Sequence, residues 1–281
     1  MENSSIRRVR ISNGLLVGLL FVGIALRAQQ TTDDLRNLAR NPVGDAIKVP
    51  FSEVFNFDAG PYGRTANSLQ TLPIIPLQAG ENWLLIPRIA ATPMAYLPDA
   101  TQASGGSTGV GDTIATFFLT PAHTGPVIWG VGPALLIPTA TNGNLGAGKW
   151  DLGPAVAVLV QPDWGSFGAV AQNIWSLPAN SQRLSVHQMQ IETSLSYNLP
   201  DGWYVFTSPT INADWTQSGQ HRWFVPFGGG IGRTFNIANQ AVDLNIAVYS
   251  NAIRPAREFS PKWQMSLQCT LLYPRNRKPA D

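Results

Sequence analysis

The chain has 281 residues, of which 44% are hydrophobic and only 13% are charged, with 26 glycines, 22 prolines and nine tryptophans. A soluble domain carries about 25% charged residues, so this composition argues against an ordinary soluble surface. Mean hydropathy is −0.01, and after the N-terminus no run reaches the roughly 18 apolar residues of a membrane-spanning helix. Low charge without a spanning helix is typical of a membrane β-barrel, whose strands have one apolar and one polar face.

Residues 1–28 are predicted to be a cleaved secretory signal. Basic residues precede an apolar run over 14–26, and Ala28 is the expected last residue removed. The alternative is a short N-terminal membrane anchor. Removing this segment leaves 15 Lys and Arg against 16 Asp and Glu, and this balance does not indicate nucleic acid as a partner.

Residues 29–47 form the next predicted segment. Within it, TTDDLRNLARNP predicts a short helix around 36–40, started by Asp33 or Asp34 and stopped before Pro42. Two interpretations stay open: a periplasmic tail, or a plug that enters the barrel from below.

Residues 188–198 show the alternation most clearly, with a polar residue at each even position and an apolar or lipid-tolerant one at each odd position. Successive side chains of a strand point to opposite faces, so one face is wet and the other is apolar. A length of about eleven residues matches a tilted membrane-spanning strand. The next segment, 203–215, alternates as well and has a tryptophan at each end.

Turn residues separate twelve predicted strands, which together predict a closed antiparallel transmembrane β-barrel over 48–274 and leave 275–281 as a tail. Short connections alternate with longer ones, as expected of periplasmic turns and extracellular loops, and an even strand number places both termini in the periplasm. In the first strand Glu53 shares a face with phenylalanines, so either that face looks inward or Glu53 lies near the rim. The predicted strands are 48–58, 68–77, 83–95, 112–121, 126–138, 149–160, 166–176, 184–198, 202–214, 221–234, 239–251 and 262–273.

All nine tryptophans fall at predicted strand ends, where their amphipathic rings suit the interface between water and lipid. At the short-turn ends lie Trp83, Trp129, Trp164 and Trp203. At the long-loop ends lie Trp150, Trp175, Trp215, Trp223 and Trp263.

The inward faces are predicted to carry mostly amides and hydroxyls. The acids Glu192, Asp214 and Asp243 are set against Arg88 and Arg222 as the expected bases, with no large excess of either sign. Charged rings set ion preference in pores, so the sequence predicts weak ion selectivity and neutral or mildly polar small solutes. The predicted lumen-lining residues are Gln188, Gln190, Glu192, Ser194, Ser196, Asn198, Asn212, Asp214, Asp243, Asn245, Gln264 and Gln268.

No metal site or cofactor is predicted, because the histidines show no paired spacing and Cys269 is the single cysteine. The glycine-rich segment 227–232 is followed by strand residues rather than a helix, so it is read as a place of close wall packing.

Two other function classes remain open besides a channel. A lipid-modifying enzyme would need a serine beside a histidine with a third polar group behind it, and Ser185, His187 and Asn173 are the candidates. A structural or adhesive barrel would show a packed lumen and more elaborate loops, of which 96–111 is the longest.

Several segments resemble one known family when taken in order: NLARNPVGDAIKVPF, GDTIATFFLTP, YNLPDGWYVFTSPTINADW, RWFVPFGGGIGRTF and a closing WQMSLQ strand. The chain resembles, over about 38–274, the Gram-negative outer-membrane family named after the meta-cleavage pathway of phenol degradation. That resemblance implies a barrel in outer-membrane lipid that takes up small, often aromatic or apolar, compounds, and it supplies no catalytic residues. The alternating strand 262–273 also resembles the terminal signal that the barrel-assembly machinery reads.

Overall fold

A computed structural model describes residues 31–177, 185–255 and 259–275. The predicted signal 1–28 and most of the predicted tail lie outside these residues. Within them, no helix has the length and apolar character to cross a membrane, a finding that concerns helices alone.

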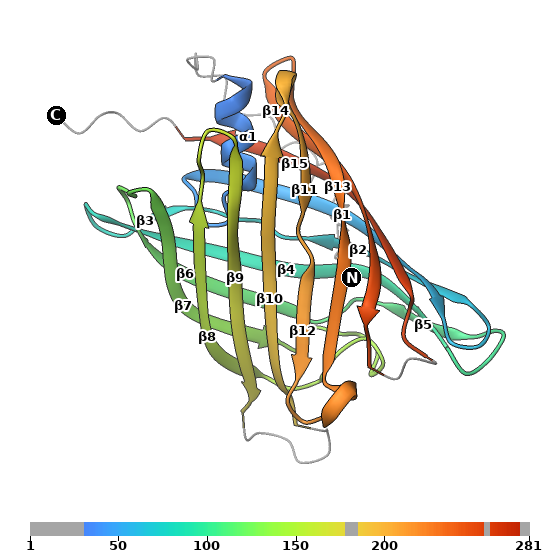
Figure 1. The fold of residues 1–281 in the computed structure, drawn as a ribbon. Helices are drawn as coiled ribbons and strands as arrows, with labels where there is room; N and C mark the ends of the chain where they lie inside the picture. Colours follow the sequence, from blue (N-terminus) through green and yellow to red (C-terminus); the bar gives the residue numbers. More distant parts are fainter. Residues whose placement is uncertain (1–30, 178–184, 256–258, 276–281) are drawn as a thin grey trace, which may run out of the picture. The chain divides into compact units, whose positions relative to one another are not determined.

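The described chain forms a closed antiparallel barrel of twelve wall strands, as predicted (Figure 1). Strands that follow one another along the chain lie side by side, and the last pairs with the first from Ala46–Pro274 to Phe57–Trp263. The wall consists of β1 (Ala46–Ala59), β2 (Arg64–Thr71), β4 (Trp83–Pro98), β6 (Thr113–Pro121), β7 (Val127–Ile137), β8 (Asp151–Val160), β9 (Gly165–Ser176), β10 (His187–Asn198), β11 (Trp203–Thr207) with β12 (Thr210–Asp214), β13 (Trp223–Ile237), β14 (Gln240–Ile253) and β15 (Trp263–Pro274).

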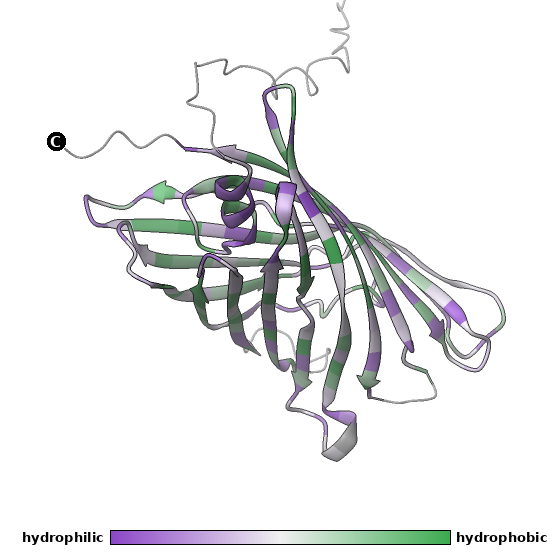
Figure 2. Ribbon diagram, turned by 45° about the horizontal axis from the view of Figure 1, so that its top comes forward, coloured by the Kyte–Doolittle hydropathy of each residue, from purple (hydrophilic) through white to green (hydrophobic). Residues whose placement is uncertain are grey.

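Alternation along the strands separates an outward apolar face from an inward face, and hydropathy changes along each strand accordingly (Figure 2). In β10, Leu195 and Tyr197 are 47% and 54% exposed on the outside. Ser196 between them is buried, and its hydroxyl lies 2.7 Å from the Ser166 hydroxyl of β9. The period of two in the sequence therefore becomes a wall with lipid-compatible and lumen sides.

Two predicted strands are interrupted by proline, which has no N–H to donate to the sheet. The prediction 68–77 was wrong in its bounds, because β2 ends at Thr71 and only Ile74 bridges to its neighbours before the short β3 (Leu77–Gln78). The predicted strand 202–214 breaks at Pro209 into β11 and β12. The expected loop 96–111 contains a further short strand, β5 (Gly106–Gly109), which pairs with β4.

Glu53 lies on the outward face of β1, so neither expectation for this residue was right. Ser52 beside it lines the lumen, and Glu53 is opposite Leu267 in the middle of β15, away from the rim. Its carboxylate accepts a hydrogen bond of 2.9 Å from the Asn67 amide of β2.

Helix α1 (Thr32–Arg40) lies at the short-turn end of the barrel (Figure 1). Thr31 is its N-cap and forms a capping box with Asp34, so the helix begins before the predicted Asp33 or Asp34. It ends before Pro42, as expected.

The tryptophans lie near the strand ends. Seven of the nine are more than 36% exposed, and Trp215 and Trp223 pack edge to face at 5.8 Å at the long-loop end. At the short-turn end Trp83 and Trp129 make a similar contact at 6.1 Å.

Candidate functional site in the barrel lumen

A cavity of about 490 Å³ occupies the middle of the barrel and is the candidate site. Residues from most of the wall strands line it, and Ala39, Arg40 and Pro42 from the end of α1 and the following segment also line it. We call this space the central cavity.

An ion pair crosses the lumen at the central cavity. Arg88 of β4 donates to the Glu192 carboxylate of β10 at 2.8 Å, although five strand-to-strand steps separate these strands in the wall. Arg88 is 5% exposed and its guanidinium also lies 5.9 Å from the centre of the Phe118 ring. Buried charges need such partners, so this pair fixes two side chains across the passage.

A second polar link lies beside this ion pair. Gln172 of β9 accepts from the Thr116 hydroxyl at 3.1 Å and donates to the Gln190 amide oxygen at 2.8 Å. Thr116 belongs to β6, so this chain of amides also spans part of the lumen.

Apolar side chains from β4, β6, β7, β8 and β9 fill part of the lumen as one cluster. Leu84 and Ile86 of β4 pack with Phe118 of β6 and with Val43, which follows α1. Further members of this cluster are Ile74, Ala134, Leu136, Ala155, Ala157, Val170 and Ile174. Branched and aromatic side chains therefore occupy space that a wide pore would leave to water.

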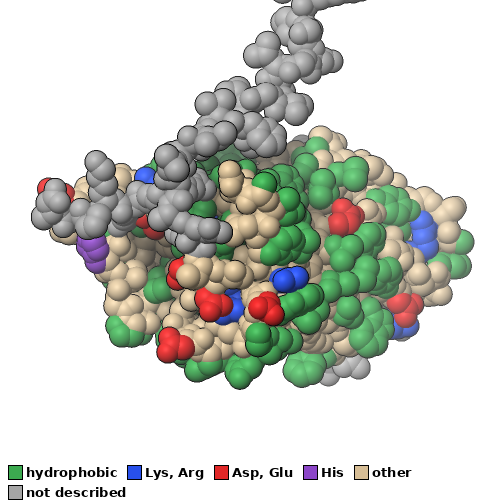
Figure 3. Space-filling view, turned by 90° about the horizontal axis from the view of Figure 1, so that it is seen from above, with side chains coloured by type: hydrophobic (Ala, Val, Ile, Leu, Met, Phe, Trp, Pro, Cys, Tyr) green, Lys and Arg blue, Asp and Glu red, His purple; other side chains and the backbone are tan. Residues whose placement is uncertain are grey.

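Hydrogen bonds attach residues 31–45 to the barrel. Arg36 donates to the carbonyl oxygens of Leu199 at 3.0 Å and Trp203 at 3.4 Å, and Gln161 donates to the Asn37 carbonyl at 2.8 Å. The space-filling view of this end shows acidic and basic side chains next to one another among hydrophobic ones (Figure 3).

Two cations form the floor of the central cavity. The Lys48 ammonium is 3% exposed and donates to the carbonyl oxygens of Asn41 and, at 3.3 Å, Leu38. Arg40 donates to the Ser208 hydroxyl at 3.0 Å, and its guanidinium lies over the ring of Phe206 at 4.7 Å. A lysine ammonium beside the last carbonyls of α1 also stabilises the negative end of the helix dipole.

A buried cluster around Asp243 supports this floor from β14. The carboxylate accepts from the Tyr204 hydroxyl at 2.8 and 2.9 Å, from Thr234 at 2.6 Å and from Asn245 at 3.2 Å. Gly232 leaves room for the Tyr204 ring, because a Cβ there would lie 2.3 Å from it.

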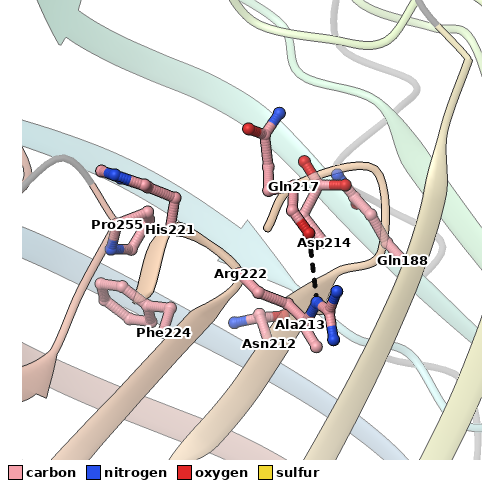
Figure 4. Close-up of a pocket in the computed structure, with 9 residues that line it drawn as sticks. All are labelled: Gln188, Asn212, Ala213, Asp214, Gln217, His221, Arg222, Phe224 and Pro255. Carbon is pink, nitrogen blue, oxygen red and sulfur yellow. Dashed lines mark hydrogen bonds between the residues drawn. The ribbon is translucent and has the colours of Figure 1, made fainter. Parts of the chain in front are cut away.

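A second cavity, of about 530 Å³, lies at the long-loop end (Figure 4). Its lining includes Gln188 of β10, Asp214 of β12 and Arg222, and the last of these donates to the Gln217 carbonyl at 3.2 Å. Arg222 also lies 5.3 Å from the centre of the Trp215 ring. We call this space the rim cavity.

The structure places the twelve predicted lumen residues in several environments. Gln190, Glu192, Ser194 and Gln268 line the central cavity, and Gln188, Asn212 and Asp214 line the rim cavity. The other five make polar contacts: Ser196 with Ser166, Asn198 with the Asp163 carbonyl, Asp243 and Asn245 with each other, and Gln264 with Asn251.

Sequence reasoning missed Arg40 and Lys48, and it placed Arg222 with Arg88 although only Arg88 lines the central cavity. Lys48 occupies an even position of β1, like Ser52, so fixing the facing of that strand would have identified it. No sequence signal showed that Arg40 follows a helix into the lumen.

The residues of the enzyme alternative do not come together. His187 is outside the lumen between two rings, 5.4 Å from Trp175 and 6.1 Å from Trp215. Asn173 is opposite Met189 rather than His187, and its amide oxygen accepts from the Trp215 indole at 2.7 Å. Across 31–177, 185–255 and 259–275, no hydrogen bond joins Ser185 to His187.

No group of His, Cys, Asp or Glu among the described residues could hold a metal ion. No family model and no curated protein matches the chain.

Three solved structures align with the chain, and the first of them shows a shared fold. An outer membrane channel from Pseudomonas putida F1 aligns with a TM-score of 0.57 at 18% identity, over 83% of this chain and 97% of that one. The CymD monoaromatic hydrocarbon channel aligns at 0.42 and 10% identity, over 87% and 92%. Outer membrane phospholipase A from Escherichia coli aligns at 0.42 and 12% identity, over 89% and 98%.

Proposed function

We propose that this protein is a bacterial outer-membrane channel for the passive or facilitated uptake of small apolar compounds, aromatic ones included. The observation that carries the proposal is a closed barrel with an apolar outside and an internal cavity lined by both apolar and polar side chains. The similarity of its fold to an outer membrane channel of P. putida F1 supports the same location.

The proposed path runs from the rim cavity to the central cavity. The rim cavity at the long loops would face the cell exterior, because long loops are extracellular and short turns periplasmic in such barrels. From there a solute meets the Arg88–Glu192 pair and then the floor made by Arg40 and Lys48. The partners that this path requires are outer-membrane lipid and the solute, and insertion would need the barrel-assembly machinery.

Residues 31–45 are proposed to act as a plug rather than as a loose tail. Val43 packs in the apolar cluster of the lumen, and Arg36 is hydrogen-bonded to two wall carbonyls. Both contacts hold the segment inside the short-turn end, so it must shift before a solute reaches the periplasm.

The test measures uptake of a labelled monoaromatic hydrocarbon by intact Gram-negative cells. Whole cells are required, because apolar compounds cross phospholipid vesicles without a channel, whereas the lipopolysaccharide leaflet slows them. Cells that make the protein should take up the label faster than cells that make the same protein with α1 held in place. Equal rates in both strains, with the barrel present in the outer membrane, would exclude a channel for apolar compounds.

A control must hold α1 without a change in the wall. Arg36→Cys and Leu199→Cys, joined by a short thiol-reactive linker with a reducible disulfide in its middle, offer one, since an arginine side chain spans the gap from position 36 to the Leu199 carbonyl at 3.0 Å and a direct disulfide is shorter than that. Reduction of the linker should restore uptake in the same cells, which separates a closed channel from a misfolded one.

A further inference from the structure

We propose that the central cavity contains a carboxylate-binding site formed by Arg40 and Lys48. The solute class is then a small apolar or aromatic body that carries one carboxylate group. This inference rests on the proposed channel function and narrows its substrate.

Neither cation has an acidic partner. The ion pairs of the described residues join Arg36 to Asp33, Arg88 to Glu192, Lys262 to Asp58 and Arg275 to Asp45, and none includes Arg40 or Lys48. Both side chains line the central cavity. A carboxylate in that cavity therefore has two cations available to it.

The neutral partners of the two cations leave binding capacity unused. Lys48 has three N–H donors and uses two of them, one on each of two backbone carbonyls. Arg40 uses one donor on Ser208, and its Nε has no acceptor in the described structure. A carboxylate adds the attraction of an opposite charge, which a backbone carbonyl or a hydroxyl does not offer, so an arriving carboxylate would improve the pairing of both side chains.

The acidic side chains near the two cations already have hydrogen-bond or ion-pair partners. Glu192 is paired with Arg88, and Asp112 accepts from two backbone N–H groups of the 139–148 loop. Asp243 is separated from Arg40 by the Tyr204 ring, which lies 5.1 Å from the guanidinium carbon, and its oxygens accept from three side chains. The floor of the cavity thus keeps an excess of positive charge over negative.

The walls around this floor suit an apolar body. Leu72, Ile74, Ile114 and Val170 line the same cavity, as do the hydroxyl residues Ser208, Thr210 and Thr270, and the Ser208 hydroxyl accepts from Arg40. An aromatic ring against the aliphatic side chains would direct its carboxylate to Lys48 and Arg40. The sequence predicts neutral or mildly polar small solutes, and that prediction did not take these two inward bases into account.

The test is calorimetric titration of the purified full chain in detergent with benzoate, at a pH where benzoate is ionised. Benzamide, which has nearly the same shape and no charge, and phenyltrimethylammonium, which is a cation, are titrated in parallel. We expect benzoate to bind about tenfold or more tightly than benzamide, because hydrogen bonds to a charged group are the stronger ones. The cation should not bind measurably.

Variants assign the preference to the two residues. Lys48→Met and Arg40→Gln, tested singly, should each reduce benzoate affinity by about tenfold and leave benzamide affinity unchanged. Arg233→Gln removes an exposed cation that lies over the Trp203 ring and lines neither cavity, and it is the matched control, with no effect expected. Lys48→Arg keeps the charge and should retain the preference, which a loss of folding or of the helix position would not allow.

Equal affinity for benzoate and benzamide in the unaltered protein would overturn the carboxylate site. So would a preference that survives in both Lys48→Met and Arg40→Gln, or one that Arg233→Gln abolishes. The uptake of a neutral hydrocarbon by cells is measured separately, so failure of the channel and failure of this site give different results.

Discussion

Replacement of Asp243 by alanine should destabilise the barrel by removing the acceptor at the centre of a buried cluster. Asp243 is 2% exposed, and two of its donors, Tyr204 and Thr234, are completely buried. The third donor, Asn245, is only partly buried and can reach water. Two donors are therefore left without an acceptor in Asp243→Ala.

The size of the effect follows from these two donors. Each unsatisfied buried donor costs about 1–3 kcal/mol, which gives about 2–6 kcal/mol for the pair. Removing a buried carboxylate also removes its desolvation cost, which offsets part of this loss. We therefore expect the free energy of unfolding to fall by about 2–4 kcal/mol, the lower part of that range.

The assay is urea titration of the protein folded into phospholipid vesicles, followed by fluorescence of its nine tryptophans. In a Tyr204→Phe background only Thr234 loses its acceptor, so Asp243→Ala should cost about 1–2 kcal/mol less there. Asp214→Ala at the rim cavity is the control. Additivity of Asp243→Ala and Tyr204→Phe to within about 0.5 kcal/mol would refute the hydrogen-bonded cluster as the source of the stability.

Three more changes have distinct expected outcomes. Deleting residues 31–45 should raise single-channel conductance in planar bilayers, since it removes Val43 and α1 from the lumen end; unchanged conductance would argue against the plug. Glu192→Gln should shift the reversal potential toward anion selectivity, because Arg88 loses its partner, and no shift would place the pair outside the ion path. Glu53→Lys should lower the free energy of unfolding in vesicles by up to about 2–4 kcal/mol while Glu53→Leu raises it, and the opposite order would contradict an outward Glu53.

The sequence predicted the barrel well because its signal is repeated in every strand. The alternation over 188–198 fixes which side chains of β10 face the lumen, and ladders to β9 and β12 then propagate that facing to the neighbours. Strand bounds were wrong where local chemistry overrides the period of two, at Pro73 and at Pro209. Each proline removes one backbone N–H donor from the sheet, and the sequence does not show how the neighbouring strands pair around that position.

The contents of the lumen could be predicted only in part. Polar residues on inward faces are visible as a pattern, but the pairing of Arg88 with Glu192 joins residues 104 positions apart across the barrel. Arg40 belongs to a segment with no strand period, so its place under the central cavity depends on how α1 docks. The facing of β1 was ambiguous because Glu53 interrupts its apolar side. Lys48 was therefore not recognised as an inward residue.

The central claim is that this barrel passes small apolar compounds across the outer membrane. Uptake of labelled toluene by cells, compared before and after reduction of the linker between Arg36→Cys and Leu199→Cys, tests it most directly. We expect slow uptake in the oxidised state and a clear rise after reduction, with no change in cells making the unaltered protein. Identical uptake in both redox states, while the barrel stays folded in the outer membrane, would contradict it.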